Sequence, residues 1–154
     1  MSEFFSALLI LSALSGCAKK APVQSAGDKT DAIVKSDSLK YLALGDSYTI
    51  GQSVPLNQSF PYQLTAQLNT KLKLSAPTII ATTGWTTNDL ITGITNSGLT
   101  AQTYDLVTLL IGVNDQFQGI SQNTYRSNFI ALLNTAIRFA GGNKAKVFII
   151  SIPD

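Results

Sequence analysis

Residues 104–115 read YDLVTLLIGVND, a mostly apolar run of eight residues followed by a glycine and a polar cluster. A run without strict alternation of apolar and polar residues is typical of a strand that is buried on both faces. The same character returns in KVFIISI at residues 146–152, and shorter apolar runs at 39–44 and 76–82 are also expected to be strands. These four runs predict a parallel sheet with both faces covered.

Helical patterns fill the intervals between the predicted strands. We expect helices at residues 59–72, where leucines recur every four residues, at 86–94, and at 122–140. The last of these has the clearest amphipathic pattern and is followed by a Gly-Gly pair that suits a helix end. Alternating strands and helices predict an α/β fold, of the flavodoxin-like three-layer α/β/α type with a parallel sheet.

Polar clusters follow the predicted strands, and each begins at the carboxyl end of its strand. They are the sequences Gly45-Asp46-Ser47, Thr83-Gly84-Trp85, Gly112-Val113-Asn114-Asp115 and Pro153-Asp154. In open α/β sheets, ligands bind outside the carboxyl ends of the strands. We therefore expect these clusters to meet at one edge of the sheet and to form a shared site.

The composition excludes several classes of function. The chain has 154 residues, of which 45% are hydrophobic and 13% charged, and its net charge is +2. The hydrophobic fraction is too high for a disordered chain, and the small, scattered positive charge argues against nucleic-acid binding. One cysteine excludes a disulfide framework and a cysteine-rich zinc site. The absence of histidine removes the commonest general base and the commonest metal ligand.

Common nucleotide and nucleophile motifs do not occur in the chain. It contains neither G-x-G-x-x-G nor G-x-x-x-x-G-K-[ST], so it carries no nucleotide fingerprint. Ser47 does not lie in G-x-S-x-G, because Thr49 occupies the position of the second glycine. The nucleophile elbow of the α/β-hydrolases is therefore excluded.

The first 38 residues are interpreted as a targeting segment and a linker. Residues 4–14 (FFSALLILSAL) form an apolar run that is too short to span a bilayer and that fits a secretory signal. The sequence Leu14-Ser15-Gly16-Cys17 resembles the lipobox of bacterial lipoproteins, which implies cleavage after residue 16 and lipidation of Cys17. We expect a signal peptide at 1–16, lipidated Cys17 and a flexible tether at 17–38, and a domain at 39–154. The domain is then held at a membrane of the bacterial cell envelope, in the periplasm or at the surface.

Three blocks of sequence carry a resemblance to a known family. GDSYTIG at residues 45–51, the glycine of TGWTTNDL at 83–90, and GVND at 112–115 occur in this order, each after a predicted strand. Together they resemble the SGNH/GDSL hydrolases. The resemblance implies a serine esterase that forms an acyl-enzyme at Ser47, acts on small ester substrates and needs no metal or other cofactor. It also implies an oxyanion hole made by the backbone N–H groups of Ser47 and Gly84 and the side-chain amide of Asn114.

Each of these residues also has a purely structural interpretation. Ser47 and Asp46 suit a helix cap, Gly84 suits a turn at the end of a strand, and Asn114 is a common turn residue. We expect Asp115 to be structural, with its carboxylate bonded to loop amides. Three aromatic residues are candidates for a substrate pocket, although packing in the core or at its rim explains them equally well: Trp85, Phe60 and Phe117.

The resemblance fails at the block that would supply the base. Members of the family carry an Asp-x-x-His pair near their C-terminus, whereas this chain has no histidine and Asp154 belongs to a different segment of the pattern. A serine hydroxyl without a base is a poor nucleophile. We expect a truncated family member that lacks the last strand and helix of the fold and is nearly inactive. The alternative is a non-catalytic envelope lipoprotein that binds an acyl or carbohydrate ligand.

Overall fold

Four parallel strands form the central sheet in the computed structural model, which describes residues 38–152. They are β1 (Tyr41–Gly45), β2 (Thr78–Ala81), β3 (Leu106–Leu110) and β4 (Val147–Ile149). Their order across the sheet is β2-β1-β3-β4, and every pair of neighbours is parallel. This is the strand order of the flavodoxin-like doubly wound fold, so the predicted fold class is confirmed.

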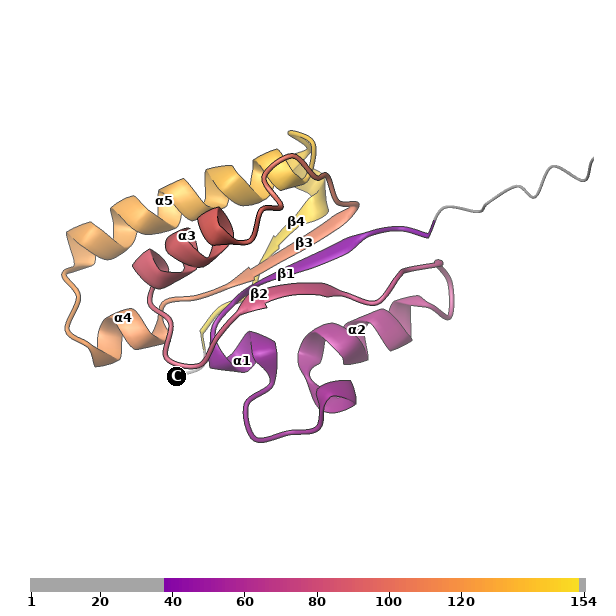
Figure 1. Ribbon diagram of the computed structural model, residues 1–154, viewed down its shortest axis with the longest axis horizontal. Coiled ribbons are helices and arrows are strands. Elements are labelled where there is room, and N and C mark those ends of the chain that lie inside the picture. Colours follow the sequence, from indigo (N-terminus) through magenta and orange to yellow (C-terminus); the bar gives the residue numbers. More distant parts are fainter. Residues whose placement is uncertain (1–37, 153–154) are drawn as a thin grey trace, which may run out of the picture. The chain divides into compact units, whose positions relative to one another are not determined.

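Helices cover both faces of the sheet, as Figure 1 shows. On one face lie α3 (Thr87–Asn96) and α5 (Gln122–Phe139), which pack against each other. On the other lie the short α1 (Ser47–Ile50) and α2 (Phe60–Leu68), which the 3₁₀ turn η1 (Leu56–Gln58) precedes. A further short helix, α4 (Val113–Phe117), follows β3 directly. The three layers agree with the predicted architecture.

The central strand β1 is buried along its whole length. Its alternate residues Leu42 and Leu44 belong to the larger core cluster, which includes Leu132 and Phe139 of α5. Tyr41 and Ala43 face the opposite way, into the smaller cluster beneath α2. Because burying a leucine side chain stabilises a fold by roughly 1.5–3 kcal/mol, the two clusters hold the sheet between its helical layers.

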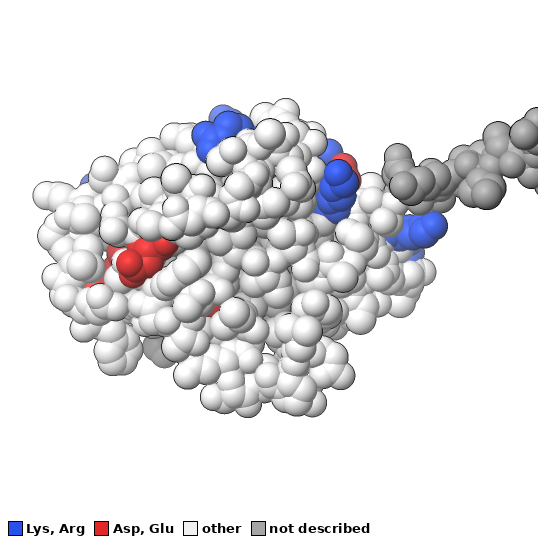
Figure 2. Space-filling view, viewed as in Figure 1, with Lys and Arg blue, Asp and Glu red and all other residues white. Residues whose placement is uncertain are grey.

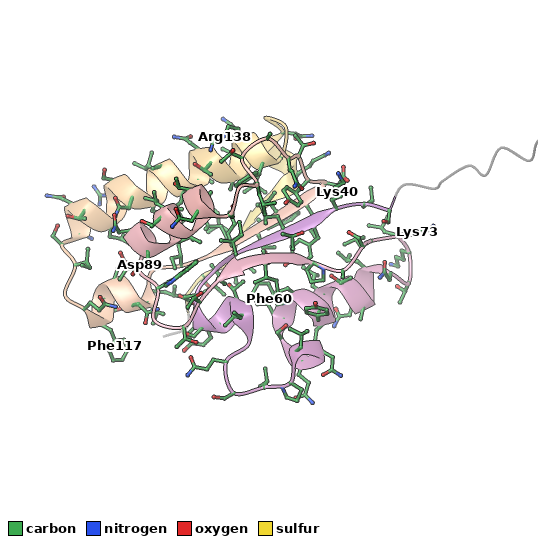
Figure 3. The ribbon with its side chains drawn as sticks, in the orientation of Figure 1. Lys40, Phe60, Lys73, Asp89, Phe117 and Arg138 are labelled. Atoms are coloured by element: carbon green, nitrogen blue, oxygen red, sulfur yellow. The ribbon has the colours of Figure 1, made fainter. Side chains whose placement is uncertain are left out.

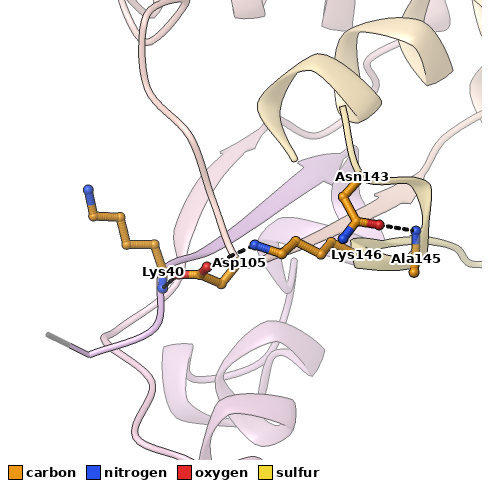
Figure 4. Close-up of polar contacts among 5 residues, drawn as sticks. All are labelled: Lys40, Asp105, Asn143, Ala145 and Lys146. Carbon is orange, nitrogen blue, oxygen red and sulfur yellow. Dashed lines mark hydrogen bonds and ion pairs between the residues drawn. The ribbon is translucent and has the colours of Figure 1, made fainter. Parts of the chain in front are cut away.

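Charged side chains tie the strands together at the amino edge of the sheet, as Figure 4 shows. The carboxylate of Asp105 accepts a hydrogen bond from the backbone N–H of Lys40 (3.1 Å) and pairs with Nζ of Lys146 (3.0 Å). Both hydrogen bonds lower the pKa of Asp105, and the one with Lys40 has the larger effect. The 3₁₀ turn η2 (Lys144–Lys146) is capped by the side chain of Asn143. The starts of β1, β3 and β4 are thereby joined.

Within the described residues, β4 is an edge strand that pairs with β3 alone. It is shorter than the predicted strand at 146–152, because only three of its residues pair with β3. Phe148 and Ile149 are 55% and 53% exposed. Among the described residues, β4 is therefore an apolar edge strand with its side chains partly open to solvent.

The predicted helix at 59–72 ends four residues earlier than expected, at Leu68. The side chain of Asn69 stops it, because its Oδ1 accepts a hydrogen bond from the backbone N–H of Leu74 (2.6 Å). Leu72, expected on the apolar stripe, instead lies outside the helix and is exposed. Local side-chain bonding of this kind competes with helix extension.

None of the helices within residues 38–152 is both long and apolar enough to cross a membrane. The proposed signal peptide, Cys17 and nearly all of the tether lie outside the described residues, and so do Pro153 and Asp154. The described residues lie within one compact unit of the chain, residues 36–154.

Candidate active site

Three strands of the sheet end level with one another at the carboxyl edge. In the pairing register, Gly45 of β1 lies opposite Ala81 of β2 on one side and opposite Leu110 of β3 on the other. Ser47, Gly84 and Asn114 follow these strand ends within four residues. Because adjacent strands lie about 4.8 Å apart, the structure brings the three residues to one edge, with Ser47 after the middle strand β1.

Ser47 is the first residue of α1, which begins directly after a tight turn. The turn requires Gly45, because a Cβ at this position would collide with the carbonyl oxygen of Leu110 and with the hydroxyl of Thr49. Oδ1 of Asp46 caps the helix by accepting a hydrogen bond from the backbone N–H of Tyr48 (3.0 Å). Within residues 38–152, no hydrogen bond engages the hydroxyl or the backbone N–H of Ser47.

Gly84 lies in the exposed loop between β2 and α3, with a φ of +82°. A Cβ there would meet no atom within 4 Å, so backbone conformation and not space favours glycine at this position. The side-chain amide of Gln118 donates to the carbonyl oxygen of Gly84 (3.2 Å) and holds this peptide unit. The backbone N–H of Gly84 has no acceptor in the part of the chain that the structure describes.

Asn114 lies on α4, and its side chain reaches the loop between β2 and α3. Its Nδ2 donates to the carbonyl oxygen of Trp85 at 2.9 Å, which joins α4, after β3, to the loop after β2. Strands β2 and β3 flank β1, so the hydrogen bond links the segments on either side of the end of β1. An amide nitrogen carries two N–H groups, and the second remains available for another acceptor.

Asp115, which is buried, links α4 to the start of α3. Its two carboxylate oxygens accept hydrogen bonds from the backbone N–H of Thr87 (2.9 Å) and from the Thr87 hydroxyl (2.6 Å). That hydroxyl in turn accepts a hydrogen bond from Nδ2 of Asn128 on α5 (3.1 Å). The buried Asp115 is therefore a structural tie between α4, the start of α3 and α5.

Thr87, Gln118 and Asn128 support the site but were missed in the sequence. One nearby sequence pattern, Thr86-x-x-Asp89, is typical of a capping box at the start of a helix. The structure has this box, in which Thr86 and Asp89 exchange hydrogen bonds at the start of α3. It could have placed the helix start correctly and identified Thr87 as its first residue.

Asp46, which precedes Ser47 in the chain, is fully buried. Burial raises its pKa, and the nearby charge of Asp115 adds to the rise, while the hydrogen bond from the Tyr48 N–H opposes it. Its second oxygen, Oδ2, and the buried hydroxyl of Thr49 have no hydrogen-bond partner among the described residues. A buried acceptor in this state is costly, so this turn is held in place at the expense of stability.

An open groove of about 440 Å³ runs beside Ser47, between α1 and the start of α2. We call it the serine groove, and its lining residues are Ser47, Tyr48, Gly51, Gln52, Ser53, Val54, Gln58, Ser59 and Phe60. Ser53 has a φ of +67°, which is strained for a residue other than glycine. The groove is therefore shaped by a loop under local backbone strain.

The three candidate aromatic residues lie in different surroundings. Phe60 lines the serine groove, near the beginning of α2. Trp85 is half-buried against the larger core cluster, with its ring over Gly93 of α3. Phe117 is 86% exposed and projects away from α4, as Figure 3 shows. Phe60 thus shares the serine groove with Ser47, whereas Trp85 and Phe117 do not line that groove.

No three acidic or cysteine side chains within residues 38–152 gather in a way that could hold a metal ion. At the carboxyl edge, Ser47, Gly84 and Asn114 supply a serine hydroxyl, an asparagine amide and two backbone N–H groups. Such neutral donors can stabilise an anionic oxygen next to the serine.

Several solved structures share this fold. AlinE4, an SGNH-hydrolase family esterase, is 25% identical, with a TM-score of 0.58 over 75% of this chain and 58% of its own. TesA is 19% identical, with a TM-score of 0.62, and the match covers 73% of this chain and 60% of TesA. The psychrotrophic esterase EstA from Pseudoalteromonas sp. is 14% identical, with a TM-score of 0.53 over 76% and 63%. The chain thus spans less than two thirds of the length of these proteins.

No curated protein is found to match the chain in sequence. The profile of the GDSL-like Lipase/Acylhydrolase family, however, matches residues 43–154. This match includes all three sequence blocks and extends over well more than half of the chain. The chain therefore belongs to the GDSL-like lipase/acylhydrolase family.

Proposed function

We propose that this chain carries the nucleophile and the oxyanion-binding groups of a serine hydrolase that acts on acyl esters. The observation that supports the proposal is the level ending of three adjacent strands. Ser47, Gly84 and Asn114 follow the ends of these strands, and the N–H of Gly84 has no acceptor within residues 38–152. Membership of the GDSL-like family supports the same chemistry.

In the proposed reaction, Oγ of Ser47 attacks the ester carbonyl carbon and forms a new C–O bond. The carbonyl oxygen becomes an oxyanion, which accepts hydrogen bonds from the N–H groups of Ser47 and Gly84 and from Nδ2 of Asn114. The C–O bond to the alcohol then breaks, the alcohol leaves with a proton, and an acyl-serine remains. Water attacks this intermediate, releases the carboxylic acid and restores the serine hydroxyl.

Asn114 is preorganised for this role because one of its two amide N–H groups is already held by the carbonyl of Trp85. A donor that is fixed before the reaction needs no reorganisation when charge develops. Replacing Asn114 with alanine is expected to slow acylation of Ser47 about 10²–10³-fold, as for other lost oxyanion donors. A Phe117→Ala control, at an exposed side chain of the same helix, is expected to have no effect.

The proton of Ser47 has no histidine to receive it, because none occurs in the 154 residues. Asp46 is an unsuitable substitute, since its carboxyl is buried and one of its oxygens caps α1. Proton transfer must then go to water or buffer. We propose that the 154-residue chain reacts slowly with esters and shows almost no turnover.

Reaction with a fluorophosphonate, read by intact-mass and peptide mass spectrometry, tests the proposal. We expect one phosphonate per chain on Ser47, formed faster when imidazole is added as an external base. Ser47→Ala is expected to abolish labelling, and Asn114→Ala to slow it. Labelling that persists in Ser47→Ala, or that occurs at several sites, would overturn the proposal.

The absent histidine also supports a second candidate, a non-catalytic lipoprotein that binds an acyl or carbohydrate ligand. This candidate predicts a cooperatively folded chain that binds a ligand in the serine groove. It also predicts that Ser47 is not labelled by the fluorophosphonate, even with imidazole present. The same labelling experiment therefore separates the two functions.

We further propose that Cys17 is lipidated and anchors the protein in the bacterial cell envelope. The support is the sequence Leu14-Ser15-Gly16-Cys17 after an apolar run of eleven residues. Expression in a bacterium fed radiolabelled palmitate is expected to give a labelled protein in the membrane fraction. Cys17→Ser is expected to remove the label, and a wild-type chain without label would refute the anchor.

A further inference from the structure

The surface beside Ser47 is almost free of charge. Residues 47–70 contain no Lys, Arg, Asp or Glu, although they include 24 successive positions. Of the charged residues that flank this stretch, Asp46 is fully buried and Lys71 lies beyond the end of α2. In Figure 2 the lower part of the molecule, over α1 and the loop that follows it, is correspondingly white.

The serine groove nevertheless offers many neutral polar groups. The side chains of Tyr48, Gln52, Ser53 and Gln58 line it, and none of them has a hydrogen-bond partner in the part of the chain described by the structure. Hydroxyl and amide groups both donate and accept hydrogen bonds. Their presence suits a ligand that carries hydroxyl or carbonyl groups.

Apolar side chains lie along the same stretch of chain. Of the ten large apolar side chains that are exposed among the described residues, four fall between residues 48 and 56: Tyr48, Ile50, Val54 and Leu56. Val54 and Phe60 form part of the groove wall itself. Clustered exposed apolar residues commonly mark a ligand groove or an interaction site, and here they lie next to the proposed nucleophile.

These features discriminate between substrates by charge. A phosphate-bearing ester would have to give up water at a surface that offers no cation, and desolvating an unpaired charge is costly. A neutral ester would lose no such hydration, and its polar groups would find the amides and hydroxyls of Gln52, Ser53 and Gln58. Its acyl part would lie against Val54 and Phe60.

We propose that the serine groove binds electrically neutral, hydroxyl-bearing acyl esters, such as acylglycerols or acylated sugars. The same acyl group on a phosphate-bearing carrier is bound poorly. This inference rests on the proposed role of Ser47, to which it adds a class of substrate.

Calorimetric titration of the full 154-residue chain with a matched pair of ligands tests the inference. The probes are 1-hexanoylglycerol and 1-hexanoylglycerol 3-phosphate, which share an acyl chain and differ by one phosphate group. At low ionic strength the neutral probe is expected to bind at least about tenfold more tightly, a free-energy difference of about 1.4 kcal/mol. Equal or tighter binding of the phosphate, or no binding of the neutral probe, would overturn the inference.

Charge variants locate the discrimination within the molecule. Two variants, Gln52→Lys and Gln58→Lys, each place a cation at the groove. Each is expected to tighten binding of the phosphate probe about tenfold, because the new ammonium group can pair with the phosphate. Gln67→Lys adds the same charge on α2 but outside the groove. This control is expected to leave the affinities for the neutral and the phosphate probe unchanged. If it tightened binding of the phosphate probe as much as the groove variants do, the effect would not be specific to the groove.

The two proposals fail in different ways. Ser47→Ala is expected to keep the preference for the neutral probe, because binding does not need the nucleophile. If the chain prefers the neutral probe but is never labelled by a fluorophosphonate, the proposed ligand class is supported and the proposed hydrolase function is refuted. If the chain is labelled on Ser47 but binds the two probes equally well, the hydrolase function is supported and the proposed ligand class is refuted.

Discussion

At the amino edge of the sheet Asp105 is 39% exposed and pairs with Lys146, whereas at the carboxyl edge Asp46 and Asp115 are buried. The two buried acids receive their hydrogen bonds from neutral groups, Tyr48 and Thr87. The pKa of Asp105 is lowered by its partners, and the pKa of Asp46 is raised by burial. At the amino edge a half-exposed aspartate thus stabilises the sheet, whereas at the carboxyl edge Asp115 ties the structure together and Asp46 is held at a cost.

The difference separates a structural edge from a candidate functional one. At the amino edge, the carboxylate of Asp105 is paired and the starts of the strands are joined, which is a purely structural arrangement. At the carboxyl edge, a buried oxygen of Asp46 lacks a partner and Ser53 is strained, while Ser47 and Gly84 retain unengaged groups within the described residues. Strain and unsatisfied groups of this kind cluster at functional sites.

The largest effect is expected from breaking the tie that Asp115 makes. Asp115→Ala would leave the N–H and hydroxyl of Thr87 without their acceptor, and we expect a loss of about 3 kcal/mol in the free energy of unfolding. Urea denaturation followed by circular dichroism measures this. Asp115→Asn, which keeps one acceptor oxygen, is the matched control and should lose less. A loss below that of Asp105→Ala would contradict the comparison of the two edges.

A smaller effect, with a distinctive pH dependence, is expected for Asp46→Asn. Because the pKa of Asp46 is raised in the folded chain, the native state binds a proton more tightly than the unfolded state. Stability therefore falls as pH rises through the interval between the unfolded and the folded pKa. Asparagine cannot ionise and keeps an oxygen for the Tyr48 N–H, so the variant should gain stability relative to the wild type as pH rises through this interval.

Thermal melts of the two proteins across the acidic range measure this difference. Ser47→Ala, which leaves the carboxyl in place, is the control and should keep the wild-type slope. Identical slopes for the wild type and Asp46→Asn would mean that Asp46 does not titrate differently in the folded chain.

The smallest effect is expected at the amino edge, for Asp105→Ala. The pKa of Asp105 is lowered, so its contribution is present above the unfolded pKa and is lost as pH falls through the folded value. Because the pair is more than one third exposed, we expect a loss of only about 0.5–1 kcal/mol at pH 7. Urea denaturation at two salt concentrations measures it, and an effect that is unchanged by salt would argue against an ion pair.

The fold could be predicted from the sequence because its apolar runs and its long amphipathic helix give clear patterns. The apolar run at 104–111 contains β3, and the helix expected at 122–140 differs from α5 by one residue at its end. The short helices α1 and α4 were not predicted, since four or five residues are too few to display a helical period. Their positions are set instead by tertiary contacts at the strand ends.

The candidate site was predictable only in part. Ser47, Gly84 and Asn114 could be selected from their positions after strands, but their roles remain predictions. Thr87 and Asn128 could not be found this way, because they are 41 residues apart in sequence and meet only through packing of α3 and α5. The burial of Asp46 was also hidden, because a Gly-Asp-Ser turn looks the same whether it is exposed or enclosed.

The most direct test of the central claim is a crystal structure of the chain after reaction with a fluorophosphonate. The phosphonate on the serine represents the tetrahedral intermediate of ester hydrolysis. We predict phosphorus bonded to Oγ of Ser47, with one phosphoryl oxygen about 2.7–3.1 Å from the backbone nitrogens of Ser47 and Gly84 and from Nδ2 of Asn114. A phosphoryl oxygen that faces solvent, away from Gly84 and Asn114, would contradict the account.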